Sequence, residues 1–287
     1  MDQFDYDFLS TLVKNESGLV LTQDKSYLLE SRLMPIVRKR ELSTLADLVK
    51  LAKSGSDKSI TKEITDAMTT NESFFFRDNK PFEIFQNAVL PRLIETRKFK
   101  KSFKIWCAAA SSGQEPYSLA MILKEEARKL AGWRTDILAT DISTDILKKA
   151  KQGLYSQFEV QRGLPVTKLV QHFEKDGDNW QISNELRSMV EYKEFNLLDS
   201  LKPLGIFDVV FCRNVLIYFD QETKTKILSE ICNILTSDGL LFLGGAETVL
   251  GLSDSFRPIP DFRGVYEVVQ GDGMESFSAL IEERATA

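Results

Sequence analysis

Residues 105–118 constrain the fold more than any other part of this chain, because they read in succession as a strand, a tight turn and a helix. An apolar run ends at Cys107, small residues follow as far as Gly113, and a helical pattern runs from Pro116 to Leu130. A turn of small residues lets a ligand approach the backbone closely. In an α/β sheet such a turn lies at the carboxyl edge, where ligands bind.

The next apolar strand, residues 137–141, ends in an acid, Asp141. A carboxylate there can accept hydrogen bonds from both hydroxyls of a ribose. The turn is neither Gly-x-Gly-x-x-Gly nor Gly-x-x-x-x-Gly-Lys, which disfavours a dinucleotide and a phosphate loop. A ligand with adenosine but no phosphate fits better, and S-adenosylmethionine is the candidate we favour. The alternative is an ordinary strand–helix turn without a ligand.

Length and composition describe a soluble globular protein with a main domain and a smaller partner. The 287 residues are 43% hydrophobic and 28% charged, and the net charge of −5 argues against broad nucleic-acid binding. No apolar run approaches the ~18–20 residues that span a bilayer, and the acidic N-terminus lacks the features of a signal peptide. We expect a cytoplasmic monomer that neither inserts into membranes nor binds nucleic acid.

Few residues suit metal binding or acid–base catalysis. The three cysteines, Cys107, Cys212 and Cys232, lie in apolar stretches and indicate buried core positions. His172 is the only histidine, and its polar segment favours a structural role. The sequence therefore predicts no metal site and no Ser/His or Cys/His catalytic set.

Helical periodicity without a strand pattern covers residues 1–70, which we interpret as a small all-helical N-terminal domain. Residues 71–101 follow as a linker and a helix over 82–96 that are expected to wall the cofactor pocket. From 102 to 270 strands and helices alternate, which is typical of a mostly parallel sheet with helices on both faces. Residues 271–287 are interpreted as a tail.

Two stretches depart from this alternation. Residues 151–188 are polar and weakly periodic, and we expect in them a helix over 168–173 and a short hairpin over 173–182 with Asp176-Gly177 as its turn. This reads as an insertion in the sheet domain rather than a separate core. The last two strands, 239–244 and 263–269, are expected to end the sheet with an antiparallel edge.

The segment Thr69–Asp78 contains three consecutive phenylalanines, which suit no amphipathic helix and indicate a buried linker along a pocket. Asn71 and Ser73 offer hydrogen bonds to a polar ligand, and Arg77 offers its guanidinium to a carboxylate. The alternative is that the aromatic residues pack two domains together and that Arg77 is a surface charge.

Polar residues also follow two later strands. Arg213 and Asn214 end an apolar strand and should face the same sheet edge as Asp141, and Asn196-Leu197 closes another strand. Tyr218 can place a phenol near the cofactor, although a core position explains it better when it is taken alone.

These segments together resemble, in order and over nearly the whole chain, the CheR family of chemotaxis receptor methyltransferases. The matching segments are Thr69–Asp78, residues 106–118, Ala139–Ser143, Phe207–Asp220 and Gly239–Glu247. The resemblance implies a helical N-terminal domain on a Rossmann-like, seven-stranded methyltransferase fold. It also implies cofactor contacts at Asn71, Ser73, Arg77, Gln114 or Glu115, Asp141, Asn196, Leu197, Arg213 and Asn214.

The family's reaction moves a methyl group from S-adenosylmethionine to chemoreceptor glutamates, leaving methyl esters and S-adenosylhomocysteine. A glutamate with an unperturbed pKa of about 4.3 is already ionised at neutral pH, so positioning and desolvation suffice without a general base. We assign Arg77 to the methionine carboxylate or the substrate, and Tyr218 to orienting the acceptor oxygen. The alternatives are a non-catalytic cofactor-binding regulator and a methyltransferase for another protein carboxylate.

Four cations on one expected short helix, Arg32, Arg38, Lys39 and Arg40, form the predicted receptor-docking face. The resemblance favours docking, since the second N-terminal helix contacts receptors in relatives, whereas the alternative is a solvated helix face. Some relatives also bind a receptor's C-terminal pentapeptide through a longer hairpin loop. The loop between Phe173 and Ile182 is short, so we expect recognition of the receptor's helical cytoplasmic domain without the pentapeptide.

Overall fold

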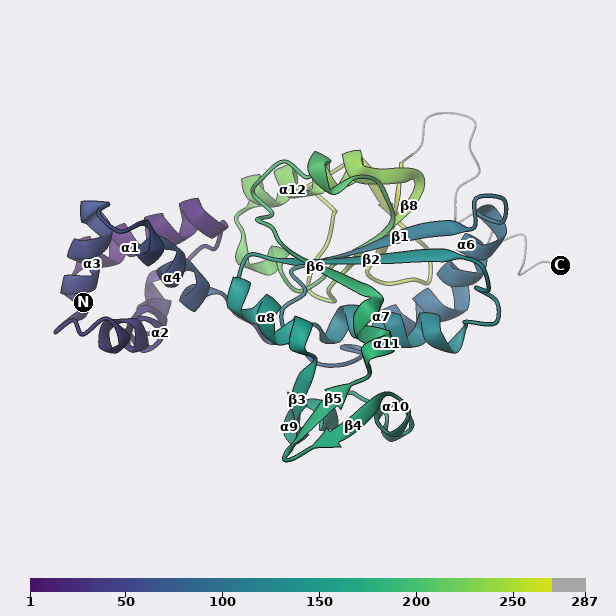
Figure 1. Ribbon diagram of the computed structural model, residues 1–287. Coiled ribbons are helices and arrows are strands. Elements are labelled where there is room, and N and C mark those ends of the chain that lie inside the picture. Colours follow the sequence, from purple (N-terminus) through teal and green to yellow (C-terminus); the bar gives the residue numbers. More distant parts are fainter. Residues whose placement is uncertain (270–287) are drawn as a thin grey trace. The chain divides into compact units, whose positions relative to one another are not determined.

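The computed structural model describes residues 1–269, which form two compact units (Figure 1). One unit comprises residues 1–70 together with Tyr218–Lys224, and the other comprises Asn71–Ile217 and the described chain from Thr225 on. The interpreted tail, residues 271–287, lies outside the described residues. Within residues 1–269, no helix is long and apolar enough to cross a membrane.

The first unit is helical, as its periodicity predicts. Its α-helices are α1 (Gln3–Ser17), α2 (Ser26–Lys39), α3 (Leu45–Ser54) and α4 (Lys58–Met68), with a 3-10 turn at Gln23–Lys25. Asp2, Thr44 and Asp57 accept backbone N–H bonds in the first turns of α1, α3 and α4, which satisfies donors that a helix start leaves open. The core of this unit includes the fully buried Leu9, Val13, Leu29, Leu33, Leu48, Ile60 and Ile64.

The second unit is built on a seven-stranded sheet in the order β6-β2-β1-β7-β8-β10-β9. The strands are β1 (Ser102–Ala108), β2 (Arg134–Asp141), β6 (Val190–Glu194), β7 (Phe207–Cys212), β8 (Leu235–Leu243), β9 (Phe256–Pro258) and β10 (Val265–Val268). The first five in spatial order pair in parallel, and β10 and β9 pair antiparallel. The predicted fold class and antiparallel edge are confirmed. Strand β9 was missed because three residues ending in proline carry no strand pattern.

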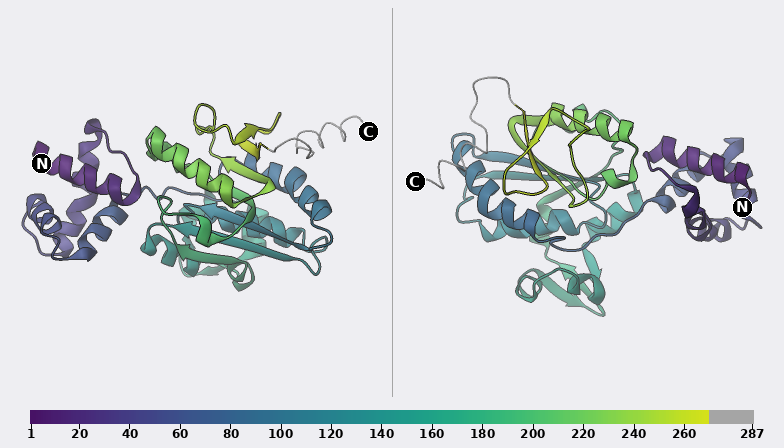
Figure 2. Two further views of the ribbon diagram at one scale, coloured as in Figure 1. Left: turned by 90° about the horizontal axis from the view of Figure 1, so that it is seen from above. Right: turned by 180° about the vertical axis from the view of Figure 1, so that it is seen from behind.

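Helices cover both faces of this sheet. Helices α7 (Gln114–Glu125) and α8 (Thr144–Gln152) lie on one face and α12 (Gln221–Ile234) on the other (Figures 1 and 2). The predicted helix over 82–96 is continuous through α5 (Lys80–Ile84), a π turn at Phe85–Val89 and α6 (Leu90–Thr96). The helix predicted over 116–130 instead begins at Gln114 and ends at Glu125.

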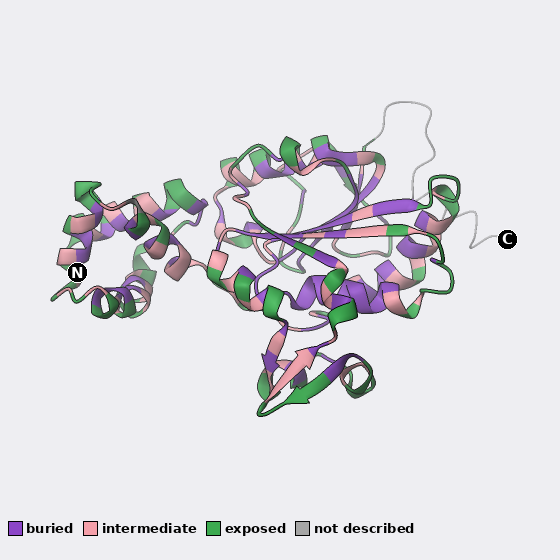
Figure 3. Cartoon of the chain, in the orientation of Figure 1, coloured by how far each residue is buried: buried purple, intermediate pink, exposed green. Residues whose placement is uncertain are grey.

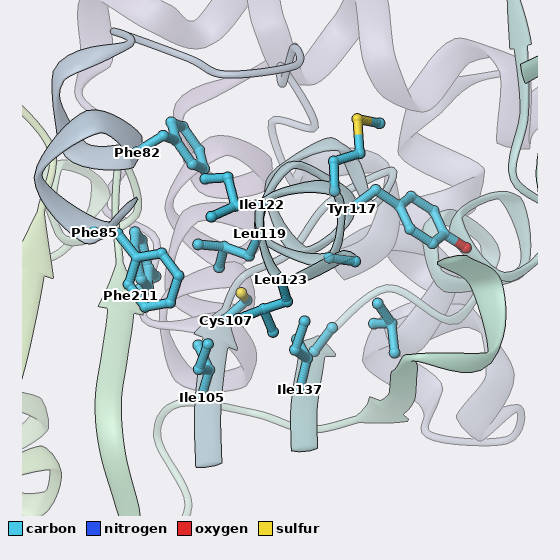
Figure 4. Packing of buried hydrophobic residues seen from close by; sticks show 14 of the residues in the cluster. Phe82, Phe85, Ile105, Cys107, Tyr117, Leu119, Ile122, Leu123, Ile137 and Phe211 are labelled. Carbon is cyan, nitrogen blue, oxygen red and sulfur yellow. The ribbon is translucent and has the colours of Figure 1, made fainter. Parts of the chain in front are cut away.

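Helix α7 is the centre of the packing. Ten consecutive residues from Gln114 to Leu123 are buried (Figure 3), so the helix is covered on every side. Its Leu119, Ile122 and Leu123 pack with apolar side chains of β1, β2, β7 and the segment Phe82–Phe85 in one cluster (Figure 4). The sheet and this helix therefore hold the loop that joins them, residues 109–113, in place.

The insertion carries more structure than a hairpin and a helix. Its strands β3 (Leu154–Ser156), β4 (Phe173–Asp176) and β5 (Asn179–Ile182) form a three-stranded sheet in the order β3-β5-β4. Its helices are α9 (Gln157–Gln161), α10 (Val166–His172) and α11 (Asn184–Ser188). The hairpin turn is Gly177-Asp178, so the turn predicted at Asp176-Gly177 was wrong by one residue. Tyr155, Phe173 and Ile182 join the main hydrophobic cluster, which confirms that the insertion has no separate core.

Phe211 offers a test of this core. It is fully buried and stacks on Phe242 with ring centroids 4.3 Å apart, so Phe211→Ala should lower the free energy of unfolding by about 3–5 kcal/mol through the cavity it leaves. The matched Phe99→Ala, at a side chain 93% exposed, should change it by less than about 0.5 kcal/mol. All three tryptophans, Trp106, Trp133 and Trp180, lie in this unit, so fluorescence-monitored unfolding reports on it alone. Equal losses in both variants would contradict the packing described.

Candidate active site at the carboxyl edge of the sheet

One carboxylate joins the β1–α7 loop to the end of β2. The two oxygens of Asp141 accept hydrogen bonds from the backbone N–H groups of Ser111 at 2.9 Å and Ser143 at 3.0 Å. Asp141 is buried, which raises the pKa of its carboxyl, and the surrounding backbone N–H groups oppose that shift. A carboxylate offers about four acceptor positions, so capacity remains for ligand hydroxyls. This buried acceptor fits the hydroxyl groups of a nucleoside's ribose.

The backbone around this acid adopts unusual conformations. Nine non-glycine residues of the described chain have positive φ, and six of them lie in the linker or in the loops after β1 and β7. These six are Phe76, Asp78, Asn79, Ala109, Ser111 and Asn214. A left-handed residue of this kind costs roughly 1–2 kcal/mol, and such residues cluster where a binding site imposes them. The edge is therefore a candidate functional site on backbone geometry alone.

Gly113 ends the β1–α7 loop with a φ of 91°. A Cβ on this residue would lie 2.6 Å from the Tyr192 hydroxyl and 3.0 Å from the Ala150 Cβ. Only glycine tolerates both the conformation and the space. The small residues of this turn thus let the loop pack against β6 and α8.

Arg213 connects three segments of the site. Its guanidinium donates to Glu115 Oε2 at 2.8 Å, to the Arg77 carbonyl at 2.9 Å and to Asp78 Oδ2 at 2.7 Å. Arg213 is buried, and its Nε has no hydrogen-bond partner among the described residues. Burial raises the pKa of Glu115, and the Arg213 charge opposes that rise. Arg213 thus holds the linker, α7 and β7 together, a role that the sequence did not reveal.

The linker lies along the β1–α7 loop and α7. The Asn71 carbonyl accepts from Ser111 Oγ at 3.0 Å, and the Phe76 N–H donates to Ser118 Oγ at 3.0 Å. Phe75 is fully buried and meets Tyr155 of the insertion edge-on, with ring centroids 5.0 Å apart. These aromatic residues therefore pack within the second unit.

Arg77 stands at the rim of the site. It is half-buried, donates to the Glu72 carbonyl at 2.9 Å and lies 5.4 Å from the Phe74 ring centroid. Its charge also acts to lower the pKa of Glu115, so the two side chains are within electrostatic reach. Among the described residues it forms no salt bridge, and its charge also acts to lower the pKa of the nearby Glu72.

The remaining predicted cofactor residues differ in their surroundings. Gln114 is buried and accepts from Ser112 Oγ at 2.8 Å. Asn196 Oδ1 accepts from the Leu198 N–H at 3.1 Å, and Leu197 is buried. Ser73 is half-buried. Gln114 begins α7, Asn196 and Leu197 follow β6, and Ser73 lies in the linker. Their contacts with a cofactor remain predictions.

Glu247 is the residue that sequence reasoning missed. It follows β8 in the run Gly244-Gly245-Ala246-Glu247, and its carboxylate accepts the Asn214 N–H at 2.8 Å. The available signal was the same as for Asp141, an acid after a strand at the carboxyl edge of the sheet.

Tyr218 belongs to the other compact unit. Its backbone carbonyl accepts from the Val20 N–H at 2.9 Å, and its side chain packs against the apolar cluster of the helical unit. The predicted orienting role of its phenol therefore stays a prediction.

The four predicted docking cations do not share one environment. Arg32 donates to the carbonyls of Met68 at 2.7 Å and Thr69 at 3.1 Å. Arg40 donates to Glu63 and Asp57, which raises its pKa. These two arginines hold α4 to α2. Arg38 is exposed, and the exposed Lys39 pairs with Glu63 at 3.2 Å.

The described residues offer little else for chemistry. Residues 1–269 contain no group of three His, Cys, Asp or Glu side chains placed to hold a metal ion. His172, the last residue of α10, is buried in the insertion, and burial lowers its pKa.

Comparison with known proteins identifies the family. A model described as CheR methyltransferase, SAM binding domain, matches residues 71–264, and one described as CheR methyltransferase, all-alpha domain, matches residues 5–69. The chain belongs to the CheR methyltransferase family. This confirms the resemblance drawn from the five motifs, and the CheR-family chain carries an S-adenosylmethionine-binding methyltransferase domain.

Named relatives agree with the family models. The chain is 38% identical over 258 residues to a chemotaxis protein methyltransferase of Vibrio parahaemolyticus, covering 89% of this chain and 93% of the relative. It is 37% identical over 265 residues to chemotaxis protein methyltransferase Cher2 of Pseudomonas putida, covering 91% and 96%. Among solved structures, PKMT2 from Rickettsia typhi aligns at a TM-score of 0.37 and 18% identity over 61% of this chain and 26% of that chain, which is too distant to inform the site.

The β1–α7 loop provides a test of the packing at the site. Gly113→Ala should destabilise the second unit by about 1–2 kcal/mol from its backbone conformation and a further ~1–3 kcal/mol from the clash with Tyr192. Gly132→Ala, with a similar φ of 77° and no atom within 4 Å of the added Cβ, should show only the conformational cost. Urea unfolding of both variants measures the difference. If the two lose the same stability, the loop does not pack as described.

Proposed function

We propose that this CheR-family chain transfers methyl groups from S-adenosylmethionine to glutamate side chains of chemoreceptors, forming methyl esters and releasing S-adenosylhomocysteine. The observation that carries the proposal is the hydrogen bond that the Ser111 N–H of the β1–α7 loop donates to Asp141, inside the segment that matches the SAM-binding model. The chemotaxis names of relatives at 37–38% identity support a receptor as the substrate.

The charges of the site suit the two ends of the cofactor. Asp141 would hold the ribose hydroxyls, and Asn196, Leu197 and Asn214 would line the adenosine. Near Arg213, the Glu115 carboxylate would pair with the α-ammonium group, which favours Glu115 over Gln114 as the contact. Arg77 would hold the α-carboxylate, because its charge reaches Glu115 and a guanidinium binds a carboxylate bidentately. Asn71 and Ser73 would complete the linker side.

The proposed reaction does not require a general base from the chain. The bound cofactor supplies an electrophilic methyl group on its sulfonium. A glutamate carboxylate is ionised at neutral pH, so the chain has to hold it in line with that methyl group and keep water out. We assign Tyr218 to orienting the acceptor oxygen. A cytoplasmic monomer fits this role, since the receptor domain it would meet is helical and cytoplasmic.

The chemical stability of the product tests the function. Purified receptor incubated with the enzyme and methyl-tritiated cofactor should gain label that mild alkali releases as methanol, since carboxyl esters are base-labile. Label that resists alkali would indicate a different acceptor. Cofactor binding without any labelling would indicate a non-catalytic regulator, and transfer to a non-receptor protein would indicate another protein carboxylate as the substrate.

Asp141 provides a test of the cofactor site. Asp141→Ala should weaken S-adenosylhomocysteine binding by roughly 1.5–3 kcal/mol, because hydrogen bonds to a charged group are lost. Titration calorimetry measures this as a rise in Kd of about 10- to 100-fold. The control is Asp145→Ala, at a side chain 79% exposed on α8, which should bind normally. Unchanged affinity in a folded Asp141→Ala protein would remove Asp141 from the site.

The receptor-docking surface rests on Arg38 and Lys39, because Arg32 and Arg40 serve the helical unit itself. Arg38→Glu should lower kcat/KM for the receptor about threefold or more without changing cofactor affinity, and the wild-type value should fall as salt screens the attraction. Lys50→Glu, at an exposed side chain on α3, is the matched reversal and should have little effect. Equal losses of kcat/KM in both variants would mean that the overall charge of the helical unit attracts the receptor, rather than a docking site at Arg38.

A receptor's C-terminal pentapeptide should not be required. Among residues 1–269, strand β4 pairs only with β5, and the exposed Glu174, Asp176 and Asp178, on this strand and in its turn, would repel a terminal carboxylate. Strand addition needs an accepting edge with suitable pockets. Titration with a synthetic pentapeptide should show no micromolar binding. Binding that disappears when Gly177–Asn179 are replaced would refute this.

A further inference from the structure

Glu247, in the loop after β8, accepts hydrogen bonds from four backbone N–H groups. Its Oε2 accepts from Asn214 at 2.8 Å and Gly244 at 2.6 Å. Its Oε1 accepts from Val215 at 2.9 Å and Ile217 at 3.3 Å. Three of the four donors belong to the segment that follows β7. No step of the proposed reaction uses this carboxylate.

The segment after β7 needs an acceptor from elsewhere in the chain. Asn214 has a φ of 59°, and the 3-10 turn Leu216–Tyr218 follows after Val215. The first N–H groups of a helical turn have no acceptor within the turn. Converging backbone N–H groups form a site for an anion, and bonds to an ionised acceptor are roughly twice as strong as neutral ones. Glu247 therefore supplies a charged acceptor to the N–H of Asn214, which has a left-handed conformation.

Gly244 allows the two loops to approach this closely. A Cβ there would lie 2.7 Å from Asn214 Nδ2 and 2.7 Å from Glu247 Oε2. Because Cys212 pairs with Leu243 across β7 and β8, both loops leave the sheet side by side at its carboxyl edge. Burial is the main cause of the raised pKa of Glu115, and the Glu247 charge adds to it. Glu247 is thus within electrostatic reach of the Arg213–Glu115 pair.

We infer that Glu247 is a positioning residue that sets the backbone of residues 214–217 so that Asn214 faces the cofactor. This inference rests on the proposed function, in which Asn214 contacts S-adenosylmethionine. Glu247 acts through Asn214 and does not touch the cofactor. Its loss should therefore weaken cofactor binding more than it slows methyl transfer at saturation.

The test compares two isosteric variants. Glu247→Gln keeps the size of the side chain but removes the charge and one acceptor oxygen, and Glu191→Gln makes the same change at an exposed position on β6. For Glu247→Gln we expect the KM for S-adenosylmethionine and the Kd for S-adenosylhomocysteine to rise about tenfold, or about 1.4 kcal/mol. Its kcat should stay within about threefold, and the amides of Asn214, Val215 and Ile217 should exchange faster. Glu191→Gln should match the wild type.

Three results would overturn the inference. Wild-type cofactor affinity in a folded Glu247→Gln enzyme is one, and a loss confined to kcat is another. A wild-type enzyme that does not bind S-adenosylhomocysteine is the third, and it alone would also refute the proposed function. If Glu247→Gln does not fold, Gly244→Ala disturbs the same junction from β8 and should raise the same KM. A normal KM in Gly244→Ala would then count against the inference.

Discussion

Helix α7 lies between two layers, and much of the second unit serves to cover it. One side packs on the sheet, and Phe75 and Phe76 of the linker and Tyr155 of the insertion help to cover the rest. Ten consecutive residues of this helix are buried, so every side of it is covered and the sheet alone is not enough. This explains why the insertion, polar and weakly periodic in sequence, shares the main core. It also explains why the linker contacts the β1–α7 loop, since the linker lies along α7 and the loop leads into its first turn.

The first turn of α7 carries the charged centre of the site. Taking Arg213 and Glu115 out of water costs several kcal/mol for each ion, and their bond at 2.8 Å, with those to Asp78 and the Arg77 carbonyl, offsets much of that cost. Such a pair contributes little net stability but specifies where three segments meet. The left-handed residues nearby, such as Ser111 and Asn214, are held by Asp141 and Glu247 in the same way. Two carboxylates, each binding backbone N–H groups, thus fix loops that have no regular structure.

Sequence reasoning succeeded where local pattern and chain topology agree. The apolar strands, the small-residue turn and Asp141 could be predicted, because parallel strands bring their carboxyl ends to one edge. It failed where a partner lies far along the chain. Arg40 reads as a docking charge in the sequence, because its acceptors are far along the chain. Asp57 lies just before α4 and Glu63 lies on it. The role of Glu247 could not be predicted, because a helix and a strand separate it from its donors at 214–217. Strand β3 could not be predicted because its three residues are too few to show a pattern.

The helical unit is assembled from two distant stretches of chain. Residues 1–70 form its helices, and Tyr218–Lys224 completes it, with Tyr218 on its apolar cluster and Lys14 paired to Asp220 at 2.8 Å. During synthesis on the ribosome, the first stretch emerges long before the second, and β1, β2, β6 and β7 are made in between. The helical unit therefore lacks Tyr218–Lys224 until most of the sheet has been translated. For the same reason, a gene fusion that cuts the chain at residue 70 would separate this unit from part of its own structure.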